Sequence, residues 1–235
     1  MLITVIIPCY NENKTIGKII DKILSLKNIN LQIIVIDDYS TDGTREILKN
    51  NISEKVDKVI YHDTNKGKGA AIKSSIKSIK GDVILIQDAD LEYDPVDYFN
   101  LLKPFNNKNV KVVYGSRVLG RSSEGKFTLI QKYRILGNYL LTKFSNLINN
   151  QTLTDAHTCY KVFDKDTFFK LNVKEDDFAF CPEVTTKLSN LNQKIFEVPI
   201  SYYGREYEDG KKIRFSDAIK AVKVIIKYKF LNKYE

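Results

Sequence analysis

Three carboxylates stand close together at Asp88, Asp90 and Glu92, directly after the apolar run Val83–Ile86. If that run is a β-strand, alternate residues point to the same side, so Asp88 and Asp90 converge just beyond its end and Glu92 can join them. Carboxylate oxygens are hard ligands that suit Mg²⁺ or Mn²⁺, and these ions keep open positions for the phosphates of a substrate. We therefore expect a metal ion that carries a diphosphate, with a solvated acidic turn as the alternative.

Length and composition restrict the class of protein. The chain has 235 residues, 43% hydrophobic and 28% charged, which is typical of a soluble globular domain large enough to bury a core. Its three cysteines lack metal-site spacing, so we expect free thiols in a reducing compartment. The N-terminal residues contain no basic segment and no cleavage site, and no apolar run approaches about 18 residues. We expect neither secretion nor a membrane span.

The net charge of +8 has three possible meanings: nucleic acid, an anionic membrane surface or a phosphate-bearing substrate. The lysines are spread along the whole chain, and no signature of a nucleic-acid-binding module is present. We interpret most of them as a solvated basic surface and expect no nucleic-acid partner.

Strand and helix patterns alternate through the first half of the chain. Apolar runs predict strands at 2–7, 32–36, 58–61, 83–86 and 110–114, with amphipathic helices between them. This order is typical of an α/β fold with a mostly parallel sheet, in which ligands bind beyond the carboxyl ends of the strands. Gly67 and Gly69 flank Lys68 in a turn before one helix, where they could cradle a phosphate or simply form a turn.

Several motifs, in this order along the chain, resemble one known family. They are Pro8-Cys9-Tyr10-Asn11-Glu12, Asp37-Asp38-Tyr39-Ser40-Thr41-Asp42-Gly43, Asp88-Ala89-Asp90-Leu91-Glu92 and Gly115-Ser116-Arg117, followed by segments at 155–163, 182–185 and 197–203. The chain is similar to the family 2 glycosyltransferases of GT-A fold, and within them to the branch of dolichol-phosphate mannose synthase and bacterial polyprenyl-phosphate glycosyltransferases. The resemblance covers nearly the whole chain. It implies a GT-A, Rossmann-like α/β domain with a mixed, mostly parallel sheet flanked by helices.

The resemblance implies which residues bind the nucleotide. They follow or end the first two strands: Pro8, Tyr10, Glu12, Ile36 and Asp38. Tyr10 would offer an aromatic face and Glu12 an acceptor for the ribose or base, while Ile36 and Asp38 would contact the base. An aspartate that accepts the imino N–H of uracil or guanine is sensible chemistry, and a capped turn is the alternative for Asp38.

The same resemblance places Asp88, Ala89 and Asp90 at the diphosphate, with the two acids binding Mg²⁺ or Mn²⁺ directly or through water. Glu92 would be a third metal ligand, although a relative of this kind has glutamine at its position. The metal and cationic side chains would stabilise the charge that builds on the departing diphosphate. The candidate cations are Arg117, Arg134, Arg205 and Lys212, each of which could instead be a surface charge.

The implied reaction is inverting transfer of a sugar from a UDP- or GDP-sugar to a polyprenyl phosphate. A phosphate monoester has a second pKa of about 6, so this acceptor is already ionised and needs no strong base. A saccharide or other hydroxyl acceptor is the alternative, and Asp155 or Glu183 would then take its proton. We expect Asp90, Arg117 and Asp155 to be catalytic, and His157 to be structural. A non-catalytic nucleotide-sugar-binding module is a further alternative, against which the intact Asp-x-Asp argues.

Two amphipathic helices are predicted in the second half of the chain. The first, 127–150, we expect to pack on the sheet, with contact to a lipid tail as the alternative. The second, 215–231, has an apolar stripe with Lys220, Lys223 and Lys227 off it, so it could lie in an anionic bilayer interface or pack on the domain. We therefore divide the chain into a catalytic domain, 1–212, and a C-terminal helix, 213–235. We expect a cytoplasmic protein, which the bilayer alternative would place on the cytoplasmic face of a membrane.

Overall fold

The computed structural model describes residues 1–120, 129–204 and 215–231. Within these ranges, seven strands form one sheet: β1 Leu2–Cys9, β2 Asn30–Asp37, β3 Lys58–Tyr61, β4 Val83–Ile86, β5 Val112–Ser116, β6 Lys161–Asp164 and β7 Ile195–Pro199. The helices are α1 Ile16–Leu24, α2 Thr44–Ile47, α3 Lys68–Ser75, α4 Tyr98–Leu102, α5 Leu129–Asn149, α6 Lys165–Lys170, α7 Phe180–Asn190 and α8 Phe215–Ile226, which the π-helical turn Lys227–Leu231 continues.

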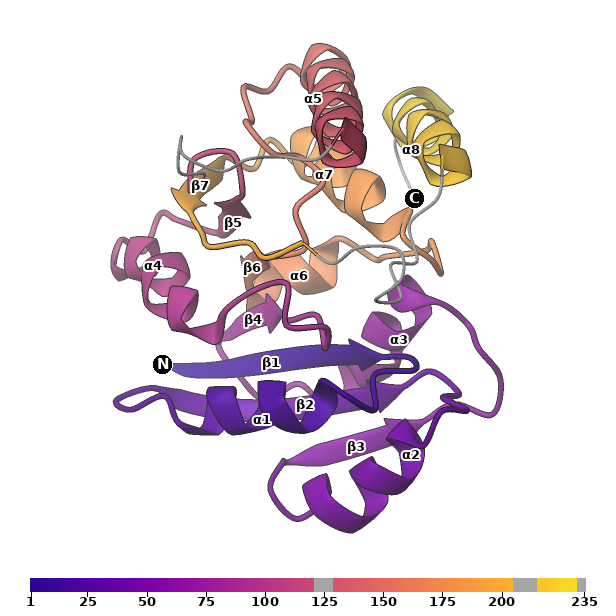
Figure 1. Ribbon diagram of the computed structural model, residues 1–235. Helices are drawn as coiled ribbons and strands as arrows, with labels where there is room; N and C mark the ends of the chain where they lie inside the picture. Colours follow the sequence, from indigo (N-terminus) through magenta and orange to yellow (C-terminus); the bar gives the residue numbers. More distant parts are fainter. Residues whose placement is uncertain (121–128, 205–214, 232–235) are drawn as a thin grey trace.

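The sheet has the order β3-β2-β1-β4-β6-β5-β7 (Figure 1). The first four strands in that order are parallel, β6 lies antiparallel between β4 and β5, and β7 is parallel to β5. The predicted α/β class with a mixed, mostly parallel sheet is confirmed. Because parallel strands end at a common edge, the loops after β1, β2 and β4 meet there.

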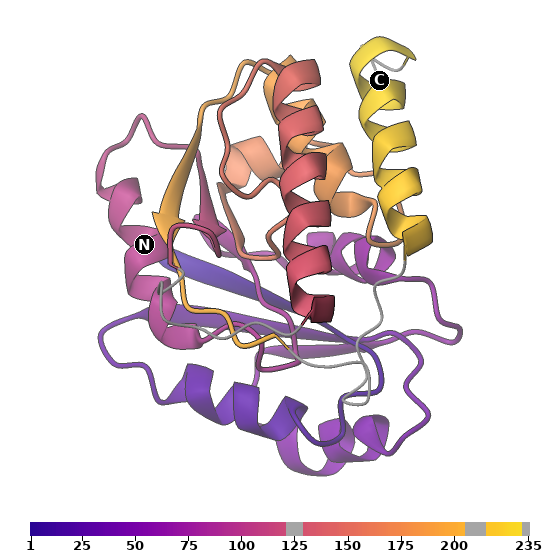
Figure 2. The ribbon, with the colours of Figure 1, turned by 45° about the horizontal axis from the view of Figure 1, so that its top comes forward.

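Helices cover both faces of the sheet, which explains why most residues of its central strands are apolar. Figure 2 shows α1 on one side of the first strands and α3 on the other. On the α1 side, Ile16, Ile19, Ile20 and Ile23 pack against β1 and β2 in one core cluster. A second cluster fills the opposite side between the sheet and helices α3, α6 and α7. The sheet is therefore a rigid base for the loops at its edge.

Strand β1 extends past the point at which the sequence predicts its end. The sequence places a stop at Pro8, but the strand runs to Cys9, with Pro8 opposite Ile36 of β2. Its pairing with β4 ends two residues earlier, at Ile6 opposite Ile86. Proline has no N–H to donate, so it is tolerated where only one neighbouring strand remains.

Helix α5 was expected to pack on the sheet with its apolar side, but it packs mainly on α7 and α8, with much of its apolar side facing outward. Its buried side chains include the polar Thr142, Ser145 and Asn149, and Asn149 donates to Thr186 Oγ1 of α7 over 3.2 Å. The outer side carries exposed apolar side chains: Tyr133, Leu136, Tyr139, Leu140 and Leu147, between 52% and 80% exposed. The polar residues can face inward because they have hydrogen-bond partners there: Asn149 bonds to α7, Thr142 to the backbone N–H of Ala156, and Ser145 to Asn149 itself.

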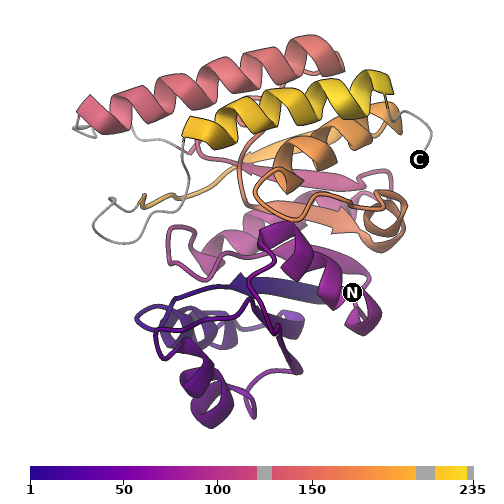
Figure 3. The ribbon, with the colours of Figure 1, turned by 90° about the vertical axis from the view of Figure 1, so that its right-hand side faces the viewer.

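Helix α8 lies beside α5 across the top of the molecule (Figure 3) and also packs on α7. One side of it is buried, with Ile225 fully covered, while Ile219 and Ile226 are 50% and 41% exposed. Lys220 pairs with Asp177, and Lys227 pairs with Glu175 at 2.9 Å. The helix is thus docked on the domain and still presents apolar side chains outward.

The predicted boundary between 212 and 213 falls outside the described residues, so the division into two parts stays a prediction. In the parts of the chain that the structure describes, no helix is both long and apolar enough to span a bilayer. The three cysteines are free, as expected.

Candidate active site

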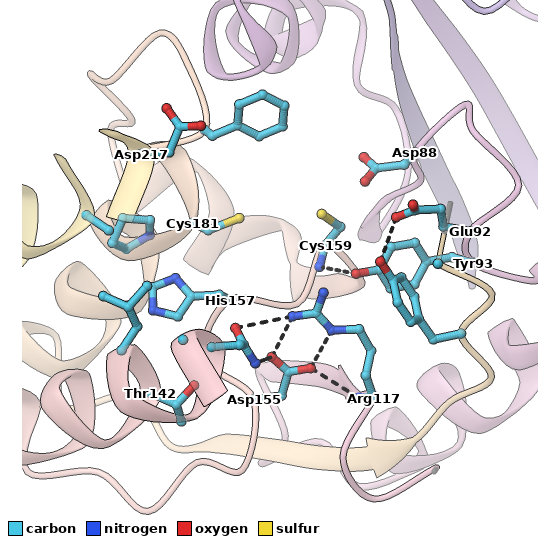
Figure 4. Close-up of a pocket in the computed structure, with 18 of the residues that line it drawn as sticks. Asp88, Glu92, Tyr93, Arg117, Thr142, Asp155, His157, Cys159, Cys181 and Asp217 are labelled. Carbon is cyan, nitrogen blue, oxygen red and sulfur yellow. Dashed lines mark hydrogen bonds and ion pairs between the residues drawn. The ribbon is translucent and has the colours of Figure 1, made fainter. Parts of the chain in front are cut away.

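A cavity of 1820 Å³ lies at the sheet edge where β1, β2 and β4 end, and extends beneath α5 and the start of α8. Sites for one drug-sized ligand typically measure about 300 to 1,000 Å³, so this cavity has room for a donor and an acceptor together. Ten predicted site residues line it: Pro8, Tyr10, Glu12, Asp38, Asp88, Ala89, Asp90, Glu92, Arg117 and Asp155. Figure 4 shows the half that contains Asp88, Arg117 and Asp155.

Four predicted residues are not placed in the cavity. Ile36 is fully buried in the core of the sheet, so only its main chain could contact a base. Arg134 falls on α5, but its side chain lies outside the described part of the structure. Arg205 and Lys212 also lie outside the described residues.

The acidic residues after β4 do not all point the same way. Lys68 Nζ donates to Asp88 Oδ1, and Asp90 Oδ1 accepts the backbone N–H of Glu92 at 3.1 Å. Glu92 Oε2 instead accepts a hydrogen bond of 2.8 Å from the hydroxyl of Tyr202. Strand β4 ends at Ile86, and Leu91 has φ 63°, so the alternation expected of a strand does not continue to Glu92.

Asp88 and Asp90 fit a hard divalent ion better than Glu92 does. Both supply carboxylate oxygens to the cavity, and Asp88 already attracts a cation, the Lys68 ammonium. Among the described side chains, no three His, Cys, Asp or Glu residues converge as a metal centre. Mg²⁺ is usually held by one or two carboxylates together with substrate phosphates, so a two-acid site suits an ion that arrives with its nucleotide.

Asp38 organises the loop between β3 and α3. Its Oδ1 lies 2.7 Å from His62 Nδ1 and accepts the N–H of Lys66 at 2.8 Å, while Oδ2 accepts the N–H of Gly67 at 2.7 Å. The carboxylate is buried, yet Asp38 also lines the cavity. It therefore positions the start of α3 whether or not it also accepts a hydrogen bond from a base.

Lys68 is a site residue that the sequence analysis did not select. Its side chain is 8% exposed, and its ammonium lies on Asp88 at the centre of the acidic motif. Burial alone would lower the pKa of Lys68, but the adjacent Asp88 carboxylate holds this pKa well above its usual value. The signal that could have identified it is the Gly67-Lys68-Gly69 turn before α3, in which two glycines hold a lysine beside a possible phosphate site.

Arg117 is clamped by Asp155. Nε donates to Oδ2 over 2.7 Å and Nη2 donates to Oδ1 over 2.8 Å, and the backbone N–H of Arg117 also reaches Oδ2 at 3.2 Å. Asn138 Nδ2 donates to Asp155 Oδ1 at 3.1 Å, and Glu197 Oε1 accepts the backbone N–H of Asp155 at 2.9 Å. The side chain of Asp155 is fully buried and that of Arg117 is 19% exposed. Among the described residues none accepts a hydrogen bond from Nη1, so the clamp fixes Arg117 and leaves this nitrogen available to a ligand.

The two carboxylates predicted as bases are poorly suited to take a proton. Burial alone would raise the pKa of Asp155, but Arg117 and Asn138 hold it well below its usual value. Glu183 is fully buried in α7, where it accepts the backbone N–H groups of Lys174 and Glu175 and pairs with Lys187 at 2.6 Å. A strong general base needs a pKa near the working pH, which the clamped Asp155 does not have.

Two further titratable side chains lie beside the Arg117 clamp. Burial, together with the nearby Lys161, lowers the pKa of His157 to about 4, so its ring is neutral near pH 7. Lys161 is fully buried and donates to the carbonyl of Ala156 at 3.0 Å, with its ammonium 3.5 Å from the ring centroid of Tyr114. Burial lowers the pKa of Lys161 to about 8. His157 therefore lines the cavity as a polar but uncharged group.

The mixed sheet, with a cavity at the carboxyl edge of its parallel strands, is the arrangement expected of the GT-A fold. Among solved structures, glucosyl-3-phosphoglycerate synthase from Mycobacterium tuberculosis aligns with 98% of this chain and 79% of its own, at a TM-score of 0.71 and 17% identity. This likeness confirms the predicted GT-A fold.

The family model described as glycosyl transferase family 2 matches residues 4–171. The chain therefore belongs to glycosyltransferase family 2, as its motifs suggested, and the predicted enzyme class is confirmed.

Curated relatives extend this similarity over most of the chain. The UDP-N-acetylglucosamine–dolichyl-phosphate N-acetylglucosaminyltransferase of Methanococcus voltae is 30% identical, over 88% of this chain and 87% of the relative. The dolichyl-phosphate beta-glucosyltransferase of Trichomonas vaginalis is 25% identical, over 98% of this chain and 74% of the relative. A low-salt glycan biosynthesis hexosyltransferase of Haloferax volcanii is 29% identical over 88% of this chain, but the match spans only 49% of that relative.

Proposed function

We propose that this protein transfers a sugar, with inversion and with the help of Mg²⁺ or Mn²⁺, from a UDP- or GDP-sugar to a polyprenyl phosphate. The observation that carries the proposal is the position of the cavity: Tyr133, Leu136 and Tyr139 of α5 line it and are also among the exposed apolar side chains. A long apolar acceptor could lie along α5 while its phosphate reaches the acidic motif.

The names of two relatives support the acceptor and the donor. Both the Methanococcus and the Trichomonas protein are named for dolichyl phosphate, and the former is also named for UDP-N-acetylglucosamine. We take a UDP-sugar as the first donor to test, with GDP-sugars as the alternative. The sugar itself is left to the experiment.

The chemistry of the site supports an acceptor that brings its own negative charge. The two carboxylates predicted as bases for a hydroxyl acceptor, Asp155 and Glu183, are both engaged with cations and N–H groups. A phosphate monoester, with its second pKa at about 6, needs no base to become nucleophilic. Because both carboxylates are already engaged in ion pairs and hydrogen bonds, the site favours a phosphate acceptor over a saccharide hydroxyl.

The residues divide the work of binding and transfer. Pro8, Tyr10, Glu12, Ile36 and Asp38 would hold the nucleoside. Asp88 and Asp90, which flank Ala89, would hold the metal ion, which when bound would stabilise charge on the leaving diphosphate. Nη1 of Arg117 would donate to the same diphosphate, positioned by Asp155, and Glu92 would order the wall of the site through Tyr202. Arg134, Arg205 and Lys212 remain proposed phosphate contacts.

We also propose that the enzyme works at the cytoplasmic face of a membrane, with α5 and α8 against the lipid. Helix α5 has no acidic residue and carries Lys132, Arg134 and Lys143, so its charge complements anionic headgroups. Its exposed tyrosines suit the interface, where one end of the ring is apolar and the other is wet. Helix α8 adds Ile219 and Ile226 beside it.

A panel assay tests the proposed reaction. Full-length protein is incubated with a short-chain polyprenyl phosphate, Mn²⁺ and each of several UDP- and GDP-sugars, and the lipid product is isolated and its anomeric configuration determined. We expect one donor to give a lipid-linked sugar of inverted configuration. The Asp90→Ala variant should bind nucleotide more weakly and transfer little. Failure of every donor with this acceptor, together with transfer to a saccharide, would establish the hydroxyl-acceptor alternative.

A further inference from the structure

Lys68 is held in place by its backbone rather than by its side chain. A Cβ on Gly67 would lie 2.5 Å from the carbonyl oxygen of Asp176, and a Cβ on Gly69 would lie 2.2 Å from that of Glu175. Gly67 also adopts φ 95° and donates its N–H to Asp38. The first turn of α3 is therefore wedged between the loop after β2 and the segment at 175–176, so the Cα of Lys68 has little freedom.

The side chain of Lys68 has the opposite character. Four methylene groups separate its ammonium from the fixed backbone, so the charge can move by several rotamer changes while α3 stays still. In this structure the ammonium donates to Asp88 Oδ1, and the two side chains are 8% and 17% exposed. A buried charge is costly unless it is paired, so Lys68 and Asp88 neutralise each other.

The same carboxylate has a second proposed partner. Asp88 is one of the two acids that fit a divalent ion, and its Oδ1 already accepts the Lys68 ammonium. A metal ion on either oxygen of Asp88 would lie beside this ammonium, and repulsion between the two cations would favour displacement of Lys68. The donor diphosphate arrives with that ion, and it brings phosphate oxygens that can accept the displaced ammonium.

We propose that Lys68 is an exchangeable counter-cation of the donor site: its ammonium holds the place of the metal ion on Asp88 and moves to the donor diphosphate when metal and nucleotide bind together. The inference rests on the proposed function, because it requires a metal-dependent nucleotide site. The exchange weakens metal binding in the absence of the nucleotide, since metal alone displaces Lys68 without offering its ammonium a new partner. The two ligands should therefore bind with positive coupling that depends on Lys68.

Direct binding measurements on the full chain test this exchange without relying on turnover. Mn²⁺ binding is followed by loss of the free-ion electron paramagnetic resonance signal, with and without UDP, in wild type, Lys68→Met and Lys77→Met. Lys77 is an exposed lysine just beyond α3, so its variant removes the same charge outside the cavity. UDP binding is measured calorimetrically at saturating Mn²⁺ in all three proteins.

We expect Lys68→Met to bind Mn²⁺ alone about tenfold more tightly than wild type, because a charged hydrogen bond no longer competes for Asp88. The same variant should bind UDP with Mn²⁺ about tenfold more weakly, since the diphosphate loses a cation. Lys77→Met should match wild type in both measurements. With UDP affinity in the absence of metal unchanged, these changes correspond to an about tenfold lower coupling between metal and nucleotide.

Two results separate the inference from the proposed function. If wild type binds Mn²⁺ with UDP, but Lys68→Met binds Mn²⁺ alone no more tightly than wild type does, the exchange is wrong and the metal-dependent site stands. If wild type binds no Mn²⁺ with or without UDP, the proposed metal site itself is wrong. Unchanged UDP affinity in Lys68→Met would overturn the second half of the exchange, the transfer of Lys68 to the diphosphate.

Discussion

The guanidinium of Arg117 and the carboxylate of Asp155 form a two-point clamp, with Nε and Nη2 on separate oxygens at 2.7 and 2.8 Å. Parallel bonds of this kind fix direction as well as charge, because the planar guanidinium matches the carboxylate. Asp155 is fully buried, so the clamp joins the loop after β5 to the start of the segment that leads into β6. We propose that the clamp presents the third nitrogen of Arg117 to the cavity.

Replacing Asp155 with asparagine should destabilise the fold as well as the site. The change leaves the guanidinium, whose side chain is 19% exposed, without its counter-charge. Breaking a buried pair by removing one partner costs about 3 kcal/mol or more. Urea denaturation should show this loss. Asp164→Asn, at a pair whose Lys111 side chain is 45% exposed, should lose less than about 1 kcal/mol, because asparagine can still cap α6. Equal midpoints for the two variants would contradict a structural role for the clamp.

The clamp also predicts the sign of a pH effect. The pKa of Asp155 would be raised by burial alone but is held below its usual value by Arg117, so the folded carboxylate binds a proton less readily than the unfolded one. The contribution of Asp155 to folding stability is fully present above the pKa of about 3.9 that this group has in the unfolded chain. It is lost as the pH falls through the lower pKa of the folded state. Wild-type stability should therefore fall more steeply than that of Asp155→Asn below about pH 4. If the stabilities of wild type and Asp155→Asn change in parallel from pH 7 to pH 3, the lowered pKa of Asp155 is wrong.

Arg117→Lys tests whether the presented nitrogen acts in transfer. Lysine keeps one charge near Asp155 but lacks the planar fork, so it cannot hold Asp155 at two points and also reach a diphosphate. We expect kcat to fall about 100-fold, with a smaller change in the KM for donor. Circular dichroism and the thermal midpoint serve as the control for folding. A near wild-type kcat would make Arg117 a structural residue.

Sugar transfer should depend on which divalent ion is present. Exhaustive chelation with EDTA should abolish transfer, and Mn²⁺ or Mg²⁺ should restore it. Ca²⁺ should restore it poorly, because it prefers more ligands and a looser geometry than two carboxylates and a diphosphate provide. Full activity after chelation would remove the metal role from Asp88 and Asp90.

The exposed side of α5 can be tested without touching the cavity. Leu140 and Leu147 are 57% and 80% exposed and lie outside the cavity lining, so a Leu140→Gln/Leu147→Gln variant should leave UDP binding unchanged. Its co-sedimentation with anionic vesicles should fall several-fold, because apolar area no longer enters the interface. Leu24→Gln on α1, at a leucine 46% exposed, is the matched control. If the wild-type protein does not co-sediment with anionic vesicles at low salt, the apolar side of α5 does not bind a bilayer.

The strands of the first half of the chain could be predicted because buried parallel strands are continuous apolar runs, which can be recognised from the local sequence alone. The five predicted strands are present, with ends shifted by up to two residues. Periodicity also found α5 and α8, but it could not tell which side of α5 faces outward. That choice depends on Thr186 and other partners distant in the chain.

Within the site, the sequence located the residues but not their partners. The spacing of Asp88, Asp90 and Glu92 suggested convergence, yet the left-handed backbone at Leu91 separates Glu92 from the other two. The pair between Lys68 and Asp88 joins residues 20 positions apart, and the Arg117–Asp155 clamp joins residues 38 apart. Such contacts depend on the order of the strands in the sheet, which cannot be predicted from a local sequence pattern.

The most direct test of the central claim is a competition between two acceptors that differ only in the phosphate. Full-length protein, Mn²⁺ and the active nucleotide sugar are incubated with equal amounts of a short-chain polyprenyl phosphate and the matching polyprenol, and the two lipid products are quantified. We predict glycosylated polyprenyl phosphate and no glycosylated polyprenol, because neither Asp155 nor Glu183 is a suitable base and the site relies on an acceptor that is already ionised. Sugar transfer to the polyprenol at a comparable rate would contradict it.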